Sequence, residues 1–289
     1  MVVQSVSVVI PAKNESLAIG DVVSQVLQLM PSAEVIVVDD GSTDTTALLA
    51  AESGALVVSH PYSKGNGAAV KSGARAATGD VIVFMDGDGQ HDARDILRLL
   101  EKIEQGYDLV VGARDKKSQA SFGRLMANTF YNKFSSWIVG RKIEDLTSGF
   151  RAVKRHKFLK FLYLLPNGFS YPTTSTMAFF RAGFSVTYVP IVAAERLGES
   201  HIRIWKDGIR FLLIIFKVGT LYSPLKIFAP MSAAVSALGI FHYAYTYFDS
   251  GRFTNMSAML LLTGLLFFLL GLISEQISNL QYMRQDDEE

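Results

Sequence analysis

Hydrophobic and polar segments alternate along residues 6–111 in a pattern that predicts strands and helices in turn. Apolar runs rich in β-branched residues predict buried strands at residues 6–10, 35–38, 55–59, 81–85 and 109–111. Residues 17–30 and 68–77 have the spacing of helices, and another helix is expected after Ser42 or Thr43, which can cap it. This alternation predicts an α/β domain with a mainly parallel, doubly wound sheet and active groups in the loops after the strands.

The pattern changes near residue 209, beyond which charged residues become rare. Residues 223–248 hold one charge, Lys226, and residues 256–280 hold one acid, Glu275. Each run has the twenty or so residues needed to cross a bilayer core of roughly 30 Å. A pair of buried globular helices is the alternative, but two such runs are hard to bury in a domain this small. They predict a transmembrane hairpin.

Basic residues flank this hairpin unequally, which predicts its orientation. Those before or at the start of the first span, and the one after the second, are Arg203, Lys206, Arg210, Lys217, Lys226 and Arg284. The loop between the spans carries a single basic residue, Arg252. By the positive-inside rule, the N-terminal domain and the C-terminal tail are expected in the cytoplasm, at the inner or plasma membrane if the source is prokaryotic.

The chain therefore divides into four predicted parts. They are a cytoplasmic domain at residues 1–201, an amphipathic juxtamembrane helix at 202–222, two membrane spans within 223–281 and a cytoplasmic tail at 282–289. The 202–222 segment mixes apolar and basic residues, as in a helix that lies on lipid headgroups. A helix packed on the first domain fits the same pattern, and the segment could do both.

Composition limits the function classes. With 289 residues the chain can form one substantial domain plus an appendage. The formal net charge of +1 gives no global field that would attract nucleic acid. Cysteine is absent, which excludes disulfides and thiolate–metal sites. The N-terminus runs directly into a strand pattern without a basic stretch, so no signal peptide is predicted.

Two aspartates follow the strand predicted at residues 81–85. Asp86 and Asp88 are two positions apart, so in a strand-like backbone both side chains point to the same side. In a parallel sheet this end faces the ligand crevice. Two carboxylates there suit Mg²⁺ or Mn²⁺, with a diphosphate supplying further oxygen ligands. An acidic turn is the alternative, since Asp and Gly are ordinary turn residues.

Two further segments offer groups for a nucleotide. Asp39 and Asp40 come just past a strand, where a carboxylate can accept hydrogen bonds from a base or a ribose; a helix cap is the alternative. Lys64 begins a Lys-Gly-Asn-Gly segment that offers a mobile cation and free backbone N–H groups for a diphosphate. The spacing is not that of a P-loop, and no Gly-x-Gly-x-x-Gly follows the first strand, which disfavours nicotinamide cofactors.

These segments and several others stand in the order seen in family 2 glycosyltransferases. The chain resembles the branch that uses polyprenyl phosphates as acceptors, similar to dolichol-phosphate mannosyltransferases and bactoprenol glucosyltransferases, over about residues 5–205. The motifs that carry the resemblance are Val9-Ile-Pro-Ala-Lys-Asn-Glu15, Val37-Val-Asp-Asp-Gly-Ser-Thr-Asp44, Lys64-Gly-Asn-Gly67, Met85-Asp-Gly-Asp-Gly-Gln-His-Asp92, Val110-Val-Gly-Ala-Arg114, Asp145-Leu-Thr-Ser-Gly-Phe-Arg151 and Arg196-Leu-Gly-Glu-Ser200. The resemblance implies a GT-A fold and inverting transfer from a nucleotide-diphosphate sugar.

The resemblance also implies roles for individual residues on the donor side. Asp86, Asp88 and Gln90 would hold the divalent ion, Mg²⁺ or Mn²⁺. The residues implied at the nucleotide sugar are Pro11, Ala12, Glu15, Asp39, Asp40, Lys64, Asp86 and Gly87. The catalytic candidates are Asp86, Asp88, Arg114 and Asp145.

On the acceptor side the resemblance is less regular. The residues implied at the lipid phosphate are Arg114, Arg124, Asn128, Arg196 and Ser200. Asn128 stands where the family often has a serine, and His201 stands where a lysine is common, although His201 also fits an ordinary surface position. Asp145 could orient the sugar or an arginine, act as a base, or cap a helix or turn.

The predicted function is inverting transfer of a hexose-type sugar from a UDP- or GDP-linked donor to undecaprenyl or dolichyl phosphate at the cytoplasmic membrane face. The predicted partners are a nucleotide sugar, a polyprenyl phosphate and the membrane, with self-association left open and no nucleic acid. The sequence specifies neither the sugar nor the base nor the polyprenol.

Two alternatives remain. A processive polysaccharide synthase of the same superfamily usually carries a Gln-x-x-Arg-Trp motif and more spans, and neither is found here. A non-catalytic membrane scaffold is disfavoured by the intact Asp86, Asp88, Gln90 and Arg114.

Overall fold

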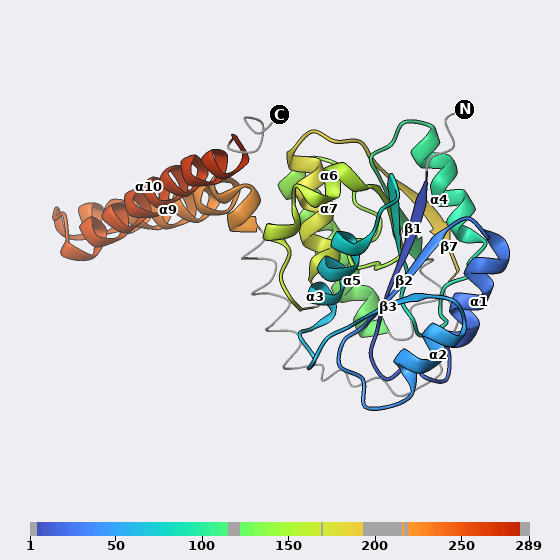
Figure 1. Ribbon diagram of the computed structural model, residues 1–289. Coiled ribbons are helices and arrows are strands. Elements are labelled where there is room, and N and C mark those ends of the chain that lie inside the picture. The colour runs from blue at the N-terminus through green and yellow to red at the C-terminus, as the bar shows by residue number, and fades with distance from the viewer. Residues whose placement is uncertain (1–4, 115–121, 169, 193–215, 217–218, 284–289) are drawn as a thin grey trace. The chain divides into compact units, whose positions relative to one another are not determined.

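The computed structural model describes residues 5–114, 122–168, 170–192, 216 and 219–283. The chain forms two compact units, one made of Met1–Ser136 with Arg141–Arg203 and the other of Trp137–Gly140 with Ile204–Glu289. The first unit is an α/β domain, and the second contains a pair of long apolar helices (Figure 1).

A seven-stranded sheet forms the centre of the first unit. Its strands are β1 (Val6–Ala12), β2 (Glu34–Asp39), β3 (Leu56–Ser59), β4 (Val81–Phe84), β5 (Leu109–Arg114), β6 (Arg151–Lys154) and β7 (Val186–Ile191). They lie in the order β3-β2-β1-β4-β6-β5-β7. Every neighbouring pair is parallel except the two that β6 makes with β4 and β5. The predicted mainly parallel α/β sheet is confirmed, and β6 and β7 add to the five predicted strands.

Helices connect these strands and lie against the sheet (Figure 1). They are α1 (Ile19–Leu29), α2 (Thr46–Glu52), α3 (Asn66–Ala76), α4 (Asp95–Glu104), α5 (Phe122–Val139), α6 (Arg155–Leu159) and α7 (Tyr171–Arg181), with a short 3₁₀ turn, η2 (Leu162–Leu164), between the last two. The predicted helices at 17–30 and 68–77 correspond to α1 and α3.

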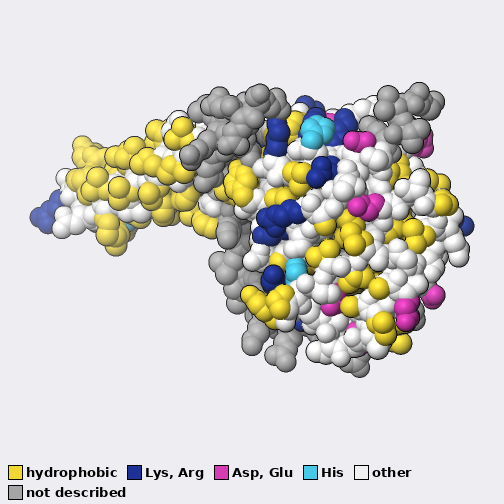
Figure 2. All heavy atoms as spheres, viewed as in Figure 1, with side chains coloured by type: hydrophobic (Ala, Val, Ile, Leu, Met, Phe, Trp, Pro, Cys, Tyr) yellow, Lys and Arg dark blue, Asp and Glu magenta, His cyan; other side chains and the backbone are white. Residues whose placement is uncertain are grey.

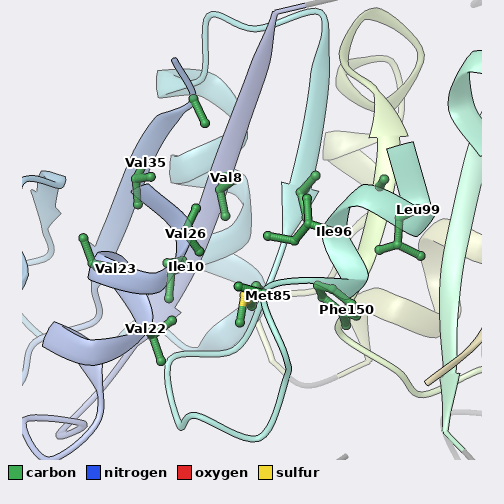
Figure 3. Packing of buried hydrophobic residues seen from close by; sticks show 14 of the residues in the cluster. Val8, Ile10, Val22, Val23, Val26, Val35, Met85, Ile96, Leu99 and Phe150 are labelled. Carbon is green, nitrogen blue, oxygen red and sulfur yellow. The ribbon is translucent and has the colours of Figure 1, made fainter. Parts of the chain in front are cut away.

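The main hydrophobic core lies between one face of the sheet and helices α1 and α4 (Figure 3). Val8 and Ile10 alternate along β1 with residues that face the other way, so both project into this layer. They share it with Val26 of α1 and Ile96 of α4, and all four side chains are fully buried. Burying such a side chain contributes about 1.5–3 kcal/mol, so this layer fixes the strand register.

Helix α3 lies against the opposite face of the sheet. A Cβ atom at Gly73 would collide with the Val9 side chain and would lie 3.0 Å from Cγ2 of Val38. A glycine at this position therefore lets α3 approach β1 and β2 closely. The small residues of the predicted 68–77 helix serve this packing.

The second unit contains the two apolar helices α9 (Pro224–Ser250) and α10 (Asn255–Met283). Each has a stretch long and apolar enough to cross a membrane, with mean hydropathies of 1.5 and 2.4. Only 17% of each stretch is buried, so these are not the core helices of a globular domain. Small residues lie where the two helices are in contact, and Ser232 Oγ of α9 donates a hydrogen bond to Gly264 O of α10 at 2.7 Å.

Polar contacts close the base of this hairpin. Leu225 N, in the first turn of α9, donates to Glu275 Oε2 of α10 at 3.2 Å. Lys226 Nζ donates to Ile138 O at 2.6 Å, at the carboxyl end of α5. The two charged residues of the predicted spans, Lys226 and Glu275, therefore pair with backbone groups near helix ends. Most of the predicted amphipathic segment, residues 202–222, lies outside the described residues.

Candidate active site

The carboxyl ends of β1, β2 and β4 meet at one edge of the sheet. Ala12, the last residue of β1, is in register with Asp39, the last of β2, and Asp40 N donates to Ala12 O at 2.9 Å. Asp86 follows β4 by two residues, and a Cβ at Gly87 would lie 3.4 Å from the Cβ of Ala12. The structure therefore brings the three predicted donor-side segments together at this edge.

Asp86 is the central carboxylate of the site, and its side chain is 37% exposed. His91 Nε2 lies 3.6 Å from its Oδ2, and the His91 ring stacks on Phe150 at 4.9 Å between centroids. Burial alone would raise the pKa of Asp86, but His91, Arg114 and Arg151 outweigh it and hold the pKa below its usual value. Asp86 is therefore ionised at neutral pH.

The backbone leaves little room beside this carboxylate. A Cβ atom at Gly149 would lie 3.0 Å from Asp86 Oδ2 and 3.2 Å from the hydroxyl of Tyr171. That hydroxyl donates to Gly149 O at 3.2 Å, and Tyr171 is almost fully buried. Gly149 thus allows the loop before β6 to pass directly beside Asp86.

The donor atoms of this loop fit a hard divalent cation. Asp86 and Asp88 supply carboxylate oxygens and Gln90 an amide oxygen, the ligand types that Mg²⁺ and Mn²⁺ prefer. Within the described part of the chain, no three His, Asp or Glu side chains converge as a metal cluster. Such a site would leave coordination positions for phosphate oxygens of a substrate, as Mg²⁺ sites with one or two carboxylates usually do.

Arg114, the last residue of β5, forms a bidentate ion pair with Asp145. Its Nε donates to Asp145 Oδ2 at 2.8 Å, its Nη2 donates to Oδ1 at 3.1 Å, and Nη2 also donates to Thr147 Oγ1 at 2.6 Å. Burial alone would lower the pKa of Arg114 and raise that of Asp145, yet the pair shifts both pKa values in the opposite directions. Asp145 is therefore ion-paired with an arginine, which fits one of the roles that the sequence left open.

Arg151, at the start of β6, is a functional candidate that sequence reasoning missed. Its guanidinium is fully buried and donates from Nη1 to Ser175 Oγ at 2.7 Å and to Pro172 O at 3.0 Å. Burial lowers its pKa, while the negative charges of Asp145 and Asp86 act in the other direction. Arg151 thus places a fixed positive charge behind the two carboxylates.

His91 and Tyr171 were also missed. Arg151 and His91 both lie within motifs that carry the family resemblance, so the signal was present but no role had been attached to them. Tyr171 lies in no such motif and is brought to the site by α7.

Asp39 and Asp40 differ in their surroundings, although both are buried. Asp39 Oδ1 accepts a hydrogen bond from Ser42 N at 3.1 Å, in a turn before α2. Asp40 accepts four hydrogen bonds from the segment 60–65, each at 2.8 Å. Burial raises the pKa of Asp40, but these hydrogen bonds hold it below its usual value.

Three of the backbone N–H groups that the Lys64-Gly-Asn-Gly segment was expected to offer are already used. Lys64 N and Gly65 N donate to Asp40, Gly67 N donates to Gly168 O at 3.2 Å, and Ala68 N donates to Asn167 O at 3.1 Å. The loop is therefore anchored by its own backbone. The side chain of Lys64 stays exposed, with its Nζ 5.9 Å from the centre of the Tyr62 ring.

The remaining donor-side candidates lie in the loop after β1. Pro11 and Ala12 end the strand, and Asn14 adopts a left-handed backbone with φ of 55°. Asn14 Oδ1 accepts a hydrogen bond from Thr43 N at 2.9 Å, and Glu15 N donates to Thr46 Oγ1 at 2.9 Å. These bonds hold the loop against the one that contains Asp39.

The acceptor-side candidates are described only in part. Arg124 and Asn128 belong to helix α5, but their side chains lie outside the described residues. Arg196, Ser200 and His201 also lie outside them. Arg114 is the one predicted acceptor contact whose side chain the structure places.

Comparison with known proteins gives two family matches. The model described as Glycosyl transferase family 2 matches residues 7–163, and the model described as GtrB C-terminal hairpin matches residues 223–280. The first covers the strands and loops of the site through α6. The second covers both apolar helices.

Several named relatives match over most of the chain. Glycosyltransferase AglJ of Haloferax volcanii is 29% identical over 96% of this chain and 94% of its own. Polyprenol monophosphomannose synthase of Mycolicibacterium smegmatis is 33% identical over 68% of this chain and 80% of its own. A dolichyl-phosphate hexose transferase of Haloferax volcanii is 29% identical over 73% of this chain and 92% of its own.

Solved structures share the fold of the first unit. Glucosyl-3-phosphoglycerate synthase from Mycobacterium tuberculosis, in complex with Mn²⁺, UDP and phosphoglyceric acid, is 26% identical with a TM-score of 0.60. The match covers 74% of this chain and 78% of that one.

Proposed function

The chain belongs to glycosyl transferase family 2, and from that premise we propose that it transfers a sugar from a nucleotide-diphosphate sugar to a polyprenyl phosphate at the cytoplasmic face of a membrane. Its first unit has the GT-A fold, as predicted, and its two apolar helices match the GtrB C-terminal hairpin. The observation that carries the proposal is this union of a nucleotide-type site with a membrane hairpin in one chain. It suits a water-soluble donor and an acceptor that stays in the bilayer.

The names of the relatives support the choice of acceptor. Proteins named polyprenol monophosphomannose synthase, dolichyl-phosphate hexose transferase and undecaprenyl-phosphate 4-deoxy-4-formamido-L-arabinose transferase all match this chain. They differ in the sugar but share a polyprenyl-type phosphate. We therefore extend the acceptor class to this protein and leave the sugar open.

The acceptor needs no strong base. A phosphomonoester has its second pKa near 6, so a lipid phosphate is largely dianionic at pH 7 and is already a nucleophile. One of its oxygens attacks the anomeric carbon as the bond to the diphosphate breaks, which inverts that carbon and releases a nucleoside diphosphate. Asp145, whose pKa is lowered by Arg114, serves to hold that arginine.

The donor side would bind the nucleotide at the ends of β1 and β2. Pro11, Ala12 and Glu15 would flank it, and Asp39 would accept hydrogen bonds from the base or ribose.

The leaving diphosphate would lie near the loop after β4. Asp86, Asp88 and Gln90 would hold Mg²⁺ or Mn²⁺ there, with Gly87 giving close backbone approach. The bound ion would neutralise charge that develops on the diphosphate. Lys64 would add a second cation on the same group.

The acceptor phosphate would be held by arginines. Arg114 ends β5 at the same sheet edge as Asp86, and Asp145 fixes its guanidinium plane. Arg124 and Asn128 of α5, with Arg196 and Ser200, would complete the contacts. Arginine suits this task because its planar fork can bind a phosphate through two parallel hydrogen bonds.

A donor panel tests the proposal. The full-length protein in nanodiscs would receive radiolabelled UDP- and GDP-sugars with undecaprenyl phosphate, and with undecaprenol as the matched acceptor without phosphate. We expect one sugar on each lipid phosphate and none on the free alcohol. Polymeric product would favour a processive synthase, and no transfer from any donor would favour a scaffold.

A further inference from the structure

Asp40 and His60 form a buried pair beside the donor side of the site. We propose that they are positioning residues, which fix the 60–65 loop so that Lys64 is presented to the diphosphate of the donor. This inference rests on the proposed function and assigns Asp40 a different part from the base or ribose contact that the family resemblance implies.

The carboxylate of Asp40 is already fully used. Its Oδ1 accepts from His60 Nδ1 and from Lys64 N, and its Oδ2 accepts from Ser63 Oγ and Gly65 N, all at 2.8 Å. A carboxylate has about four lone-pair sites, so no acceptor position is left for a nucleotide. Asp40 is also buried, with only 4% of its surface exposed, so little water can compete for its carboxylate.

His60 links this carboxylate to helix α3. The Nδ1 atom must carry the proton, because the ionised Asp40 can only accept. In the neutral ring Nε2 is then an acceptor, and Ser72 Oγ lies 2.9 Å from it and can donate. His60 is 7% exposed, and its backbone N donates to Asp39 O at 2.9 Å. The pair therefore ties β2, the loop and α3 together.

Two glycines allow close backbone contacts of the 60–65 loop, one at Tyr62 and one at Gly65. Gly41 has φ of +68°, and a Cβ there would lie 2.7 Å from Tyr62 C. Gly65 has φ of +102°, and a Cβ there would collide with the carbonyl oxygen of Asn167. The loop is therefore packed closely at Tyr62 and at Gly65, and the residues between them, Ser63 and Lys64, donate hydrogen bonds to Asp40.

This arrangement leaves the side chain of Lys64 as the exposed cation of the segment. The backbone N–H groups of Lys64 and Gly65 are both consumed by Asp40, whereas the Lys64 side chain is exposed. A flexible lysine gains from a fixed backbone, because less freedom is lost when its ammonium binds a phosphate. The anchored backbone of the 60–65 loop thus positions the ammonium group of Lys64.

Two substitutions at His60 separate positioning from general stability. In His60→Asn the amide nitrogen takes the place of Nδ1 and can still donate to Asp40. In His60→Gln the amide nitrogen takes the place of Nε2 and loses Asp40. We expect His60→Asn to keep the donor KM within about threefold and His60→Gln to raise it about tenfold, with the lipid KM unchanged in both.

Asp40→Asn and Lys64→Ala test the coupling directly. Each should raise the donor KM about tenfold or more, and the double variant should be no worse than Lys64→Ala alone, because both remove the same contact. Additive effects, or an increase in lipid KM of equal size, would overturn the proposal.

Trypsin provides a readout that needs no turnover. Cleavage after Lys64 in the full-length protein should be about tenfold faster in Asp40→Asn, because the anchored loop becomes free to open. Asp108→Asn is the matched control, since Asp108 is also buried and accepts hydrogen bonds from Lys154, Lys157 and Ser185. It should destabilise the domain without faster cleavage at Lys64.

The outcomes separate this inference from the proposed function. If the wild-type protein transfers sugar but Asp40→Asn changes neither cleavage at Lys64 nor donor KM, the positioning role is refuted while the function stands. If the wild-type protein transfers nothing, the function fails, and binding of UDP or GDP with Mn²⁺ decides the role of the loop. Equal nucleotide affinity in wild type, Asp40→Asn and Lys64→Ala then overturns the inference, and matched losses in both variants support it.

Discussion

Replacing Asp145 by asparagine tests whether the carboxylate orients Arg114 or acts as a base. The two oxygens of Asp145 receive different donors. Oδ2 accepts from Arg114 Nε and from the backbone N–H of Arg114. Oδ1 accepts from Arg114 Nη2, from the Thr147 hydroxyl and from the backbone N–H groups of Thr147 and Ser148. An asparagine would keep its oxygen at the more heavily used position and turn its NH₂ toward Arg114 Nε. The charge-assisted hydrogen bond from Arg114 Nε at 2.8 Å would be lost, together with the longer one from Arg114 N at 3.3 Å.

The size of the effect follows from that loss. A hydrogen bond to a charged group contributes about 1.5–3 kcal/mol. The Arg114 side chain is 31% exposed and that of Asp145 is 7% exposed, so partial screening favours the lower half of this range. A loss of about 2 kcal/mol in transition-state stabilisation corresponds to a fall of about 30-fold in kcat/KM. Arg114→Ala should cost at least as much.

The assay is sugar transfer to a short polyprenyl phosphate by single and double variants. If Asp145 acts only through Arg114, the double variant should match Arg114→Ala within about threefold. A general base would give a different result. Its removal typically costs about 10²–10⁴-fold, independently of Arg114. Additive losses, or activity of Asp145→Asn that recovers steeply at high pH, would refute the positioning role.

Four further predictions concern separate parts of the molecule. Asp86→Asn and Asp88→Ala should abolish transfer while the protein remains folded, and chelator should do the same to wild type; full activity in chelator would remove the metal from the mechanism. Asp108→Asn should lower stability by about 3 kcal/mol at pH 7 without changing either KM, as measured by denaturation in detergent. Because the folded-state pKa of Asp108 is lowered, its contribution is complete above pH of about 4 and is lost as pH falls below that value, so wild type and variant should converge in acid. Arg124→Ala should raise the lipid KM far more than the donor KM, and an unchanged lipid KM would place the acceptor phosphate elsewhere. Removing residues 223–289 should spare nucleotide-sugar binding and short soluble acceptors but reduce transfer to lipid in membranes, and equal use of membrane lipid by the truncated protein would contradict this account of acceptor delivery.

Local patterns were sufficient for the donor half of the fold. The apolar runs at β1, β2 and β4 are sequence-local signals, and the polar residues that follow each run meet because parallel strands share a carboxyl edge. Asp39 and Asp86 could therefore be grouped before the structure was known. The same logic found the hairpin, since length and apolarity alone define it.

The rest of the site depends on contacts that no local pattern encodes. Strand β6 has only four residues and lies antiparallel between β4 and β5. Its pairing with β4 brings the charge of Arg151 close enough to lower the pKa of Asp86. The use of Asp40 is hidden for a similar reason. Its neighbour Asp39 has the same residue type and the same burial, and only the path of the loop that contains His60 distinguishes them.

The position of β6 has a consequence for the order in which the chain can fold during synthesis. Strands β2, β3 and β4 can each pair as they emerge, because β2 pairs with β1, β3 with β2 and β4 with β1. Strand β5 cannot, since its two neighbours are β6 and β7. Its apolar residues Leu109 to Val111 leave the ribosome with both strand edges unpaired and wait until residue 154 has been made. During this interval the edges of β5, and the edge of β4 that will pair with β6, are open to wrong strand pairing.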